Sequence, residues 1–148
     1  MRVVGISHKT RYWQHVAFRE PPDGYRYARL VDFPWHLLPI RNAFLWHTRY
    51  FFPVRRPDIC HTYNCIVANR WPWVIEVESY LPRYRPMRAS HPLYKWGLRR
   101  LASTDCRAIL FTSEHTAGMN REHLVKAGVD PTKMSVLYRA VEQFLRFK

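Results

Sequence analysis

The last third of the chain places the strongest constraint on its fold. An apolar run over residues 108–111 is followed by a polar Thr-Ser-Glu sequence, a helical pattern over 114–127 and a second apolar run over 134–138. Gly128 is typical of a helix end, and the Asp-Pro pair after it predicts a turn. Two strands joined by such a helix belong to a parallel sheet covered by helices.

The same alternation of apolar runs and helical patterns extends over the rest of the chain. It predicts an α/β fold with a doubly wound, mainly parallel sheet and helices on both faces. The expected strands lie near residues 2–7, 25–32, 58–62 and 73–78, and the expected helices span 37–52, 93–103 and, at the end of the sequence, 141–147.

Length and charge limit the classes of function. The 148 residues suffice for one domain with a core, residues 1–148, but are too few for two α/β domains. The net charge is +13, and 19 of the 24 basic residues are arginine. Such an excess suits nucleic acid, anionic lipid or phosphate-bearing substrates, unless the arginines only solvate the fold.

The cysteines and the apolar runs predict where the protein resides. Cys60, Cys65 and Cys106 form no CxxC pair, and His61 lacks a second ligand pair, so neither a metal nor another cofactor is expected. A reduced, intracellular protein is the default. The N-terminus has no long apolar signal region, and no apolar run reaches 18 residues. A cytoplasmic location is expected, with peripheral membrane contact left open.

Polar residues end four of the expected strands. Ser7-His8, residues 61–64, residues 78–80 and residues 112–114 each follow an apolar run. Ligands of open parallel sheets bind beyond the carboxyl ends of the strands, where the strand order reverses. These four groups are therefore the candidate ligand-binding residues.

Several motifs resemble one enzyme family over residues 56–138. The sequence Arg-Pro-Asp-Ile at 56–59 leads into a strand that ends in His-Thr-Tyr-Asn. A Ser-Glu pair at 113–114 opens a helix, and Gly-Val-Asp-Pro-Thr-Lys follows that helix at 128–133. This arrangement resembles the N-terminal, acceptor-side Rossmann-like domain of GT-B glycosyltransferases of the family-4 type.

The resemblance implies transfer of a sugar from a nucleotide-sugar to a sugar or lipid-linked acceptor, with retention of configuration and without metal. The donor would be held by a second domain or a partner subunit, which the sequence lacks. We therefore expect the chain alone to be an incomplete transferase: a fragment, a degenerate relative or one subunit of a split enzyme. The first loop departs from the family because no Gly-Gly follows the strand, and Lys9 and Arg11 would supply charge there instead.

The resemblance also suggests roles for the strand-end residues. Glu78 is the candidate catalytic residue, contacting an acceptor hydroxyl or accepting its proton. Glu76 lies two residues earlier on the same strand face, either solvated or paired with an arginine. A structural role is the alternative for His61, and helix capping the alternative for the Ser-Glu pair. The candidate substrate-binding residues are His8, His61, Asn64, Ser113 and Glu114.

A second interpretation is a non-catalytic, basic Rossmann-like module that binds nucleic acid or an anionic membrane. Arg83, Arg85 and Arg88 lie in a proline-rich loop among aromatic residues, which favours an anionic surface, with Tyr80, Tyr84 and Trp96 as interfacial anchors. Nucleic acid is the weaker candidate, because no known nucleic-acid-binding signature is present. A third interpretation is a nucleotide-binding enzyme of another kind. The sequence does not support it, because it has neither a Walker loop nor a GxGxxG motif.

Overall fold

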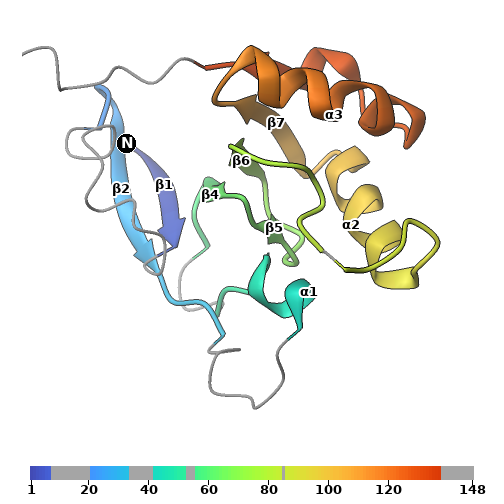
Figure 1. The fold of residues 1–148 in the computed structure, drawn as a ribbon. Coiled ribbons are helices and arrows are strands. Elements are labelled where there is room, and N and C mark those ends of the chain that lie inside the picture. The colour runs from blue at the N-terminus through green and yellow to red at the C-terminus, as the bar shows by residue number, and fades with distance from the viewer. Residues whose placement is uncertain (8–20, 34–41, 53–55, 85, 138–148) are drawn as a thin grey trace, which may run out of the picture.

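The computed structural model describes residues 1–7, 21–33, 42–52, 56–84 and 86–137. Six strands form one sheet in the order β2-β1-β4-β6-β7-β8, and each neighbouring pair is parallel (Figure 1). The protein therefore has a mainly parallel α/β, Rossmann-like fold. The six strands are β1 (Arg2–Ser7), β2 (Tyr25–Leu30), β4 (Ile59–Tyr63), β6 (Trp73–Val77), β7 (Cys106–Phe111) and β8 (Met134–Val136).

Two longer helices connect the last three strands of the sheet. Helix α2 (Pro92–Ala102) joins β6 to β7, and helix α3 (Glu114–Lys126) joins β7 to β8 through a short 3-10 helix, η4 (Pro131–Lys133). Both helices pack at the β6–β7 end of the molecule, away from β1 and β2 (Figure 1). The shorter elements are α1 (Ala43–Trp46) and a two-stranded parallel sheet of β3 (Thr48–Arg49) and β5 (Ile66–Val67).

The strand order reverses at β1. Strand β1 has β2 on one side and β4 on the other, whereas β6, β7 and β8 are added successively beyond β4. A crevice at the carboxyl ends of the strands on either side of such a reversal is the usual ligand site of an open α/β sheet. The carboxyl ends of β1 and β4, and of β6 on the other side of β4, are thus the region in which to look for a site.

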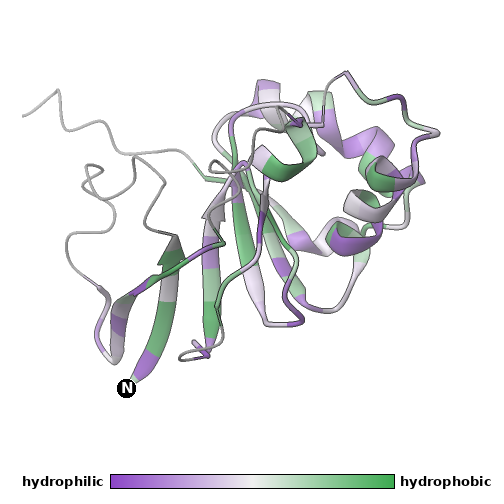
Figure 2. Ribbon diagram, turned by 90° about the horizontal axis from the view of Figure 1, so that it is seen from below, coloured by the Kyte–Doolittle hydropathy of each residue, from purple (hydrophilic) through white to green (hydrophobic). Residues whose placement is uncertain are grey.

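One face of the sheet holds the main hydrophobic core. Trp73, Ile75 and Val77 alternate along β6, and Ile109 and Phe111 do so along β7; all five side chains are fully buried. Hydrophobic side chains from α2 and α3 pack into the same cluster. Figure 2 shows hydrophobic residues concentrated along the strands, whereas the helices carry both kinds of residue. The opposite face is less buried: Val74 of β6 and His61 of β4 are only half-buried there.

The predicted positions of the six sheet strands are confirmed to within a few residues, but the helix predicted over 37–52 is wrong in its described part. Helix α1 has only four residues, and the chain then forms β3 and an antiparallel bridge between Phe51 and Asp32. Pairing of β3 with β5 provides hydrogen-bond partners for backbone N–H and C=O groups that the helix would have paired internally. Residues 37–41 and the terminal helix predicted at 141–147 lie outside the described residues.

Both the first and the last turn of helix α3 are formed by the residues that the sequence indicates. The side chain of Ser113 accepts a hydrogen bond from the Thr116 N–H at 3.1 Å, which caps the first turn. At the other end, Gly128 has φ of +85°, a conformation that strains any residue with a Cβ. Gly118, by contrast, lies inside the helix with open space where a Cβ would be.

These two glycines provide a matched pair of substitutions. We expect Gly128→Ala to lower the free energy of unfolding by about 1 kcal/mol, because alanine resists positive φ. Gly118→Ala should raise it by up to about 1 kcal/mol, because alanine is the better helix former. Urea unfolding of the two variants measures both changes, and changes of the same sign would contradict the assigned helix end.

Candidate functional site

A carboxylate is held at the carboxyl end of the central strands by an asparagine from the neighbouring strand. The side-chain amide of Asn64, which follows β4, donates to Oε1 of Glu78 at 3.1 Å. The Glu78 N–H, which follows β6, donates to the amide oxygen of Asn64 at 3.1 Å. Asn64 is buried and has φ of 50°, a left-handed conformation that asparagine tolerates better than most residues. This double contact fixes the position of Glu78.

The second oxygen of that carboxylate remains available to a ligand. Half of the Glu78 side chain is exposed, and within the described residues its Oε2 atom has no hydrogen-bond partner. Oε1 also lies 4.0 Å from a guanidinium nitrogen of Arg83, whose side chain is similarly exposed. An ion pair this open contributes little to stability, so both groups can exchange it for a ligand.

His47 is a further member of this site that the sequence did not indicate, because it fell inside the expected helix. Its ring forms a hydrogen bond with the backbone of Asn64. Burial, together with the positive charges of Arg83 and Arg49, lowers the pKa of His47 to about 4. The imidazole is therefore neutral near pH 7, and it adds no third positive charge beside the two guanidinium groups.

The segment after Glu78 is fastened to α3 by one buried asparagine. Asn120 accepts a hydrogen bond from the Leu81 N–H at 2.8 Å and donates to the carbonyl oxygens of Ser79 at 3.1 Å and Thr116 at 2.8 Å. The ring of Tyr80 stacks on a histidine of the same helix with centroids 4.3 Å apart. The strand-end segment is thus held by side-chain contacts as well as by the sheet.

Ser113 and Glu114 lie at the neighbouring strand end, but no described contact joins them to Glu78. Ser113 Oγ is 3.0 Å from the Thr116 hydroxyl and accepts from the Thr116 N–H, so it is engaged in the helix cap. Glu114 is exposed in the first turn of α3, where a negative charge is favourable. Both residues serve the helix start in this structure.

His61 of β4 faces Glu76 of β6, and no described contact joins it to Glu78. Nε2 of His61 is 3.7 Å from Oε2 of Glu76. Glu76 is buried on β6, between β4 and β7, so the expectation of a solvated position for it is wrong. The two residues lie on the sheet face opposite Trp73 and Ile75. An open pocket of about 220 Å³ on that face is lined by Val4, Pro22, Tyr25, Tyr27, Ile59, His61 and Val74.

The proline-rich loop does not present the expected aromatic anchors. The Tyr84 side chain is fully buried and its hydroxyl lies 2.9 Å from that of Thr48. Trp96 packs edge-on against an α1 phenylalanine with ring centroids 5.2 Å apart, and Tyr80 is occupied by its stacking on α3. Tyr84 therefore belongs to the core, and the rings of Tyr80 and Trp96 pack against it.

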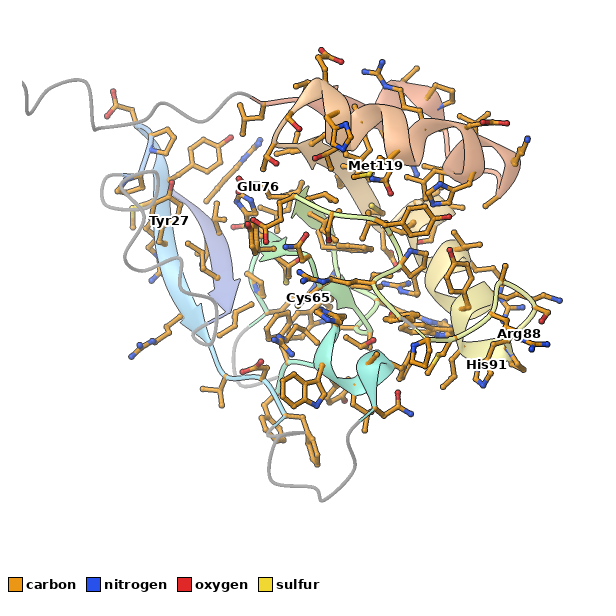
Figure 3. All side chains as sticks on the ribbon, in the orientation of Figure 1. Tyr27, Cys65, Glu76, Arg88, His91 and Met119 are labelled. Atoms are coloured by element: carbon orange, nitrogen blue, oxygen red, sulfur yellow. The ribbon has the colours of Figure 1, made fainter. Side chains whose placement is uncertain are left out.

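Two of the three arginines of that loop lie in the part of the chain that the structure describes. Arg83 lies beside Glu78, whereas Arg88 is exposed next to His91, on the side of the molecule opposite Tyr27 (Figure 3). Arg85 lies outside the described residues, as do His8, Lys9 and Arg11 of the first loop.

No protein-family model matches the chain, and neither a curated protein nor a solved structure is significantly similar to it. In the part of the chain that the structure describes, no helix is both long and apolar enough to cross a membrane. The same residues contain no group of three or more His, Cys, Asp or Glu side chains that could hold a metal ion. The three cysteines are buried, and burial raises the pKa of Cys60 and Cys106 to about 12.

Proposed function

We propose that this chain is the acceptor-side domain of a glycosyltransferase with a GT-B architecture. The observation that carries the proposal is the fixed, half-exposed carboxylate of Glu78 at the carboxyl end of β6, two strands from the reversal of strand order at β1. A carboxylate at this place suits a ligand rich in hydroxyl groups, because each free oxygen lone pair can accept a hydrogen bond from a sugar. The sequence motifs described above point to the same class.

The finer features belong to the same proposal. The sheet is doubly wound with helices on both faces, a form that the strand reversal at β1 supports. Residues 1–148 act as one domain, and the nucleotide-sugar is held by a second domain or by a partner subunit. The protein works in the cytoplasm, in peripheral contact with a membrane, and neither a metal nor another cofactor takes part.

In this proposal Glu78 positions the acceptor. Its Oε2 atom accepts a hydrogen bond from the acceptor hydroxyl and takes its proton as the new glycosidic bond forms and the bond from sugar to nucleoside diphosphate breaks. Asn64 keeps the carboxylate in place through both of its amide atoms. Arg83 lies close enough to stabilise the negative charge of the site when no acceptor is bound.

Sugar binding by the Glu78→Gln variant tests this role. Saturation-transfer NMR with methyl glycosides, disaccharides, short-chain prenyl-phosphate sugars and UDP-glucose would identify a bound sugar for the unmodified chain. Glu78→Gln should then weaken its binding about tenfold, because a hydrogen bond to a charged acceptor is lost.

The matched control is Glu122→Gln, which removes an exposed carboxylate from α3 and should leave sugar binding unchanged. If no sugar binds, or if both variants bind it equally, the acceptor role is wrong. A non-catalytic basic module would then be the better interpretation, and vesicle or nucleic-acid binding without sugar binding would support it.

A further inference from the structure

Three exposed apolar side chains lie together at the Asp32–Phe51 bridge, and a fourth, Trp46, lies on α1, which precedes β3 and the bridge in the chain. In the bridge between Asp32 and Phe51, both central side chains are buried. The Phe33 N–H donates to the carbonyl oxygen of Tyr50 at 2.8 Å, and the Phe52 N–H donates to the carbonyl oxygen of Val31 at 3.0 Å. The residues on either side of the bridge therefore lie in two facing pairs. Because side chains alternate along extended chains, those flanking side chains point outward.

The exposure of this group is unusual for the chain. Val31 is 58% exposed, Tyr50 41% and Phe52 37%, and Trp46 at the end of α1 is 59% exposed. A fourth ring, that of Phe33, lies against Phe52 with centroids 5.9 Å apart. We call Val31, Trp46, Tyr50 and Phe52 the apolar patch. They are four of the nine exposed large hydrophobic residues among those that the structure describes.

The apolar patch adjoins the candidate site through the backbone. Val31 follows the carboxyl end of β2, and Trp46 immediately precedes His47, whose ring is bonded to Asn64. Asn64 in turn holds Glu78. Figure 1 shows α1 and the segment after β2 at one end of the molecule and α3 at the other.

The charge of the protein decides what covers this patch. A second copy of the chain would bring another +13 charge to the interface, which opposes association. Asp32, an acidic residue beside the patch, is buried and paired with Arg49 at 3.2 Å, while Arg83 is exposed. Anionic lipid attracts such a surface, and tryptophan and tyrosine favour the boundary between lipid and water.

We propose that the apolar patch inserts into the interface of an anionic lipid bilayer and so presents Glu78 to a lipid-linked acceptor. The lipid attachment of the acceptor and the contact with a membrane rest on the proposed function, and the inference adds the surface that makes this contact. The insertion places the exposed rings among the headgroups and leaves the positive charge of the domain close to the anionic surface. The docking surface is therefore α1 and the Asp32–Phe51 bridge, not the aromatic residues of the proline-rich loop.

Flotation of the full chain with vesicles of phosphatidylcholine, with and without phosphatidylglycerol, tests the docking surface. The unmodified chain should bind the anionic vesicles, and less strongly at about 0.5 M salt. The double variant Val31→Ser/Trp46→Ser should bind them at least about tenfold more weakly. Met119→Ser/Val125→Ser removes two exposed apolar side chains from α3 and is the matched control, which should bind as the unmodified chain does.

Thermal unfolding shows whether both double variants fold. If the patch variant does not fold, tryptophan fluorescence in the presence of brominated lipid is compared between the unmodified chain and Trp46→Phe. Quenching of the Trp46 contribution supports insertion, and its absence overturns it.

Equal vesicle binding by both double variants also overturns the proposal. So does a dimer that the patch variant converts to a monomer without loss of vesicle binding, because a second copy is then the occupant. Glu78→Gln should retain vesicle binding, so failure of the acceptor role and failure of docking are separable.

Discussion

Replacing Asn120 with alanine is expected to lower the free energy of unfolding by about 3 kcal/mol. The side chain is fully buried and makes three hydrogen bonds, two of them to the segment after β6. Without it, the N–H of Leu81 and the carbonyl of Ser79 lose their partners in a region that water reaches poorly, and each loss costs about 1 kcal/mol or more.

Asn42→Ala is the control for this substitution. Asn42 caps α1 by accepting one hydrogen bond from the Phe44 N–H at 2.8 Å, and it is only half-buried. Its loss should cost about 1 kcal/mol. Urea unfolding of both variants gives the comparison, and equal losses would mean that Asn120 is not the main fastening of the Ser79–Leu81 segment.

The main sheet could be predicted from the sequence because its strands are apolar runs bounded by turn residues. Residues 73–77 and 108–111 are continuous apolar runs apart from Glu76, which the sequence placed wrongly at a solvated position as one alternative. The pair β3 and β5 could not be predicted, because a strand of two residues has no detectable period. Their pairing depends on contacts between distant parts of the chain.

The candidate site was predicted in part, for a reason that the structure makes clear. Asn64 and Glu78 follow neighbouring parallel strands, and the carboxyl ends of parallel strands lie at the same edge of the sheet. His47 and Asn120 follow no strand of the main sheet. Asn120 reaches Leu81 across a sequence separation of 39 residues, which no local pattern reveals.

Charge was the least informative sequence feature, because identical residue types have different roles. Arg100 is half-buried and donates to the carbonyl oxygens of Val67 at 3.1 Å and Asn69 at 2.7 Å, and to the carboxylate of Asp105 at 2.8 Å. Arg83 is exposed beside Glu78. Only the packed structure separates an arginine that holds the fold from one that a ligand can reach.

The stability of the protein should fall between pH 6.5 and pH 4 through His47. The pKa of His47 is about 4 in the folded protein, against 6.5 for an ordinary histidine, and burial is the largest cause. The unfolded chain therefore binds a proton in this pH range that the folded protein does not bind, so acid favours unfolding. The full contribution is present above about pH 6.5 and is lost progressively as the pH falls toward 4.

A shift of this size corresponds to a loss of at most about 3 kcal/mol, at roughly 1.4 kcal/mol for each pKa unit. His47→Gln removes the titrating group, so the difference in unfolding free energy between pH 7 and pH 5 should become smaller than in the unmodified chain. His115→Gln, an exposed position on α3, should leave that difference unchanged. Urea unfolding at several pH values distinguishes the variants. An unaltered pH dependence in His47→Gln would mean that the His47 ring is not buried beside Arg83 and Arg49 in solution, and that it does not belong to the candidate site.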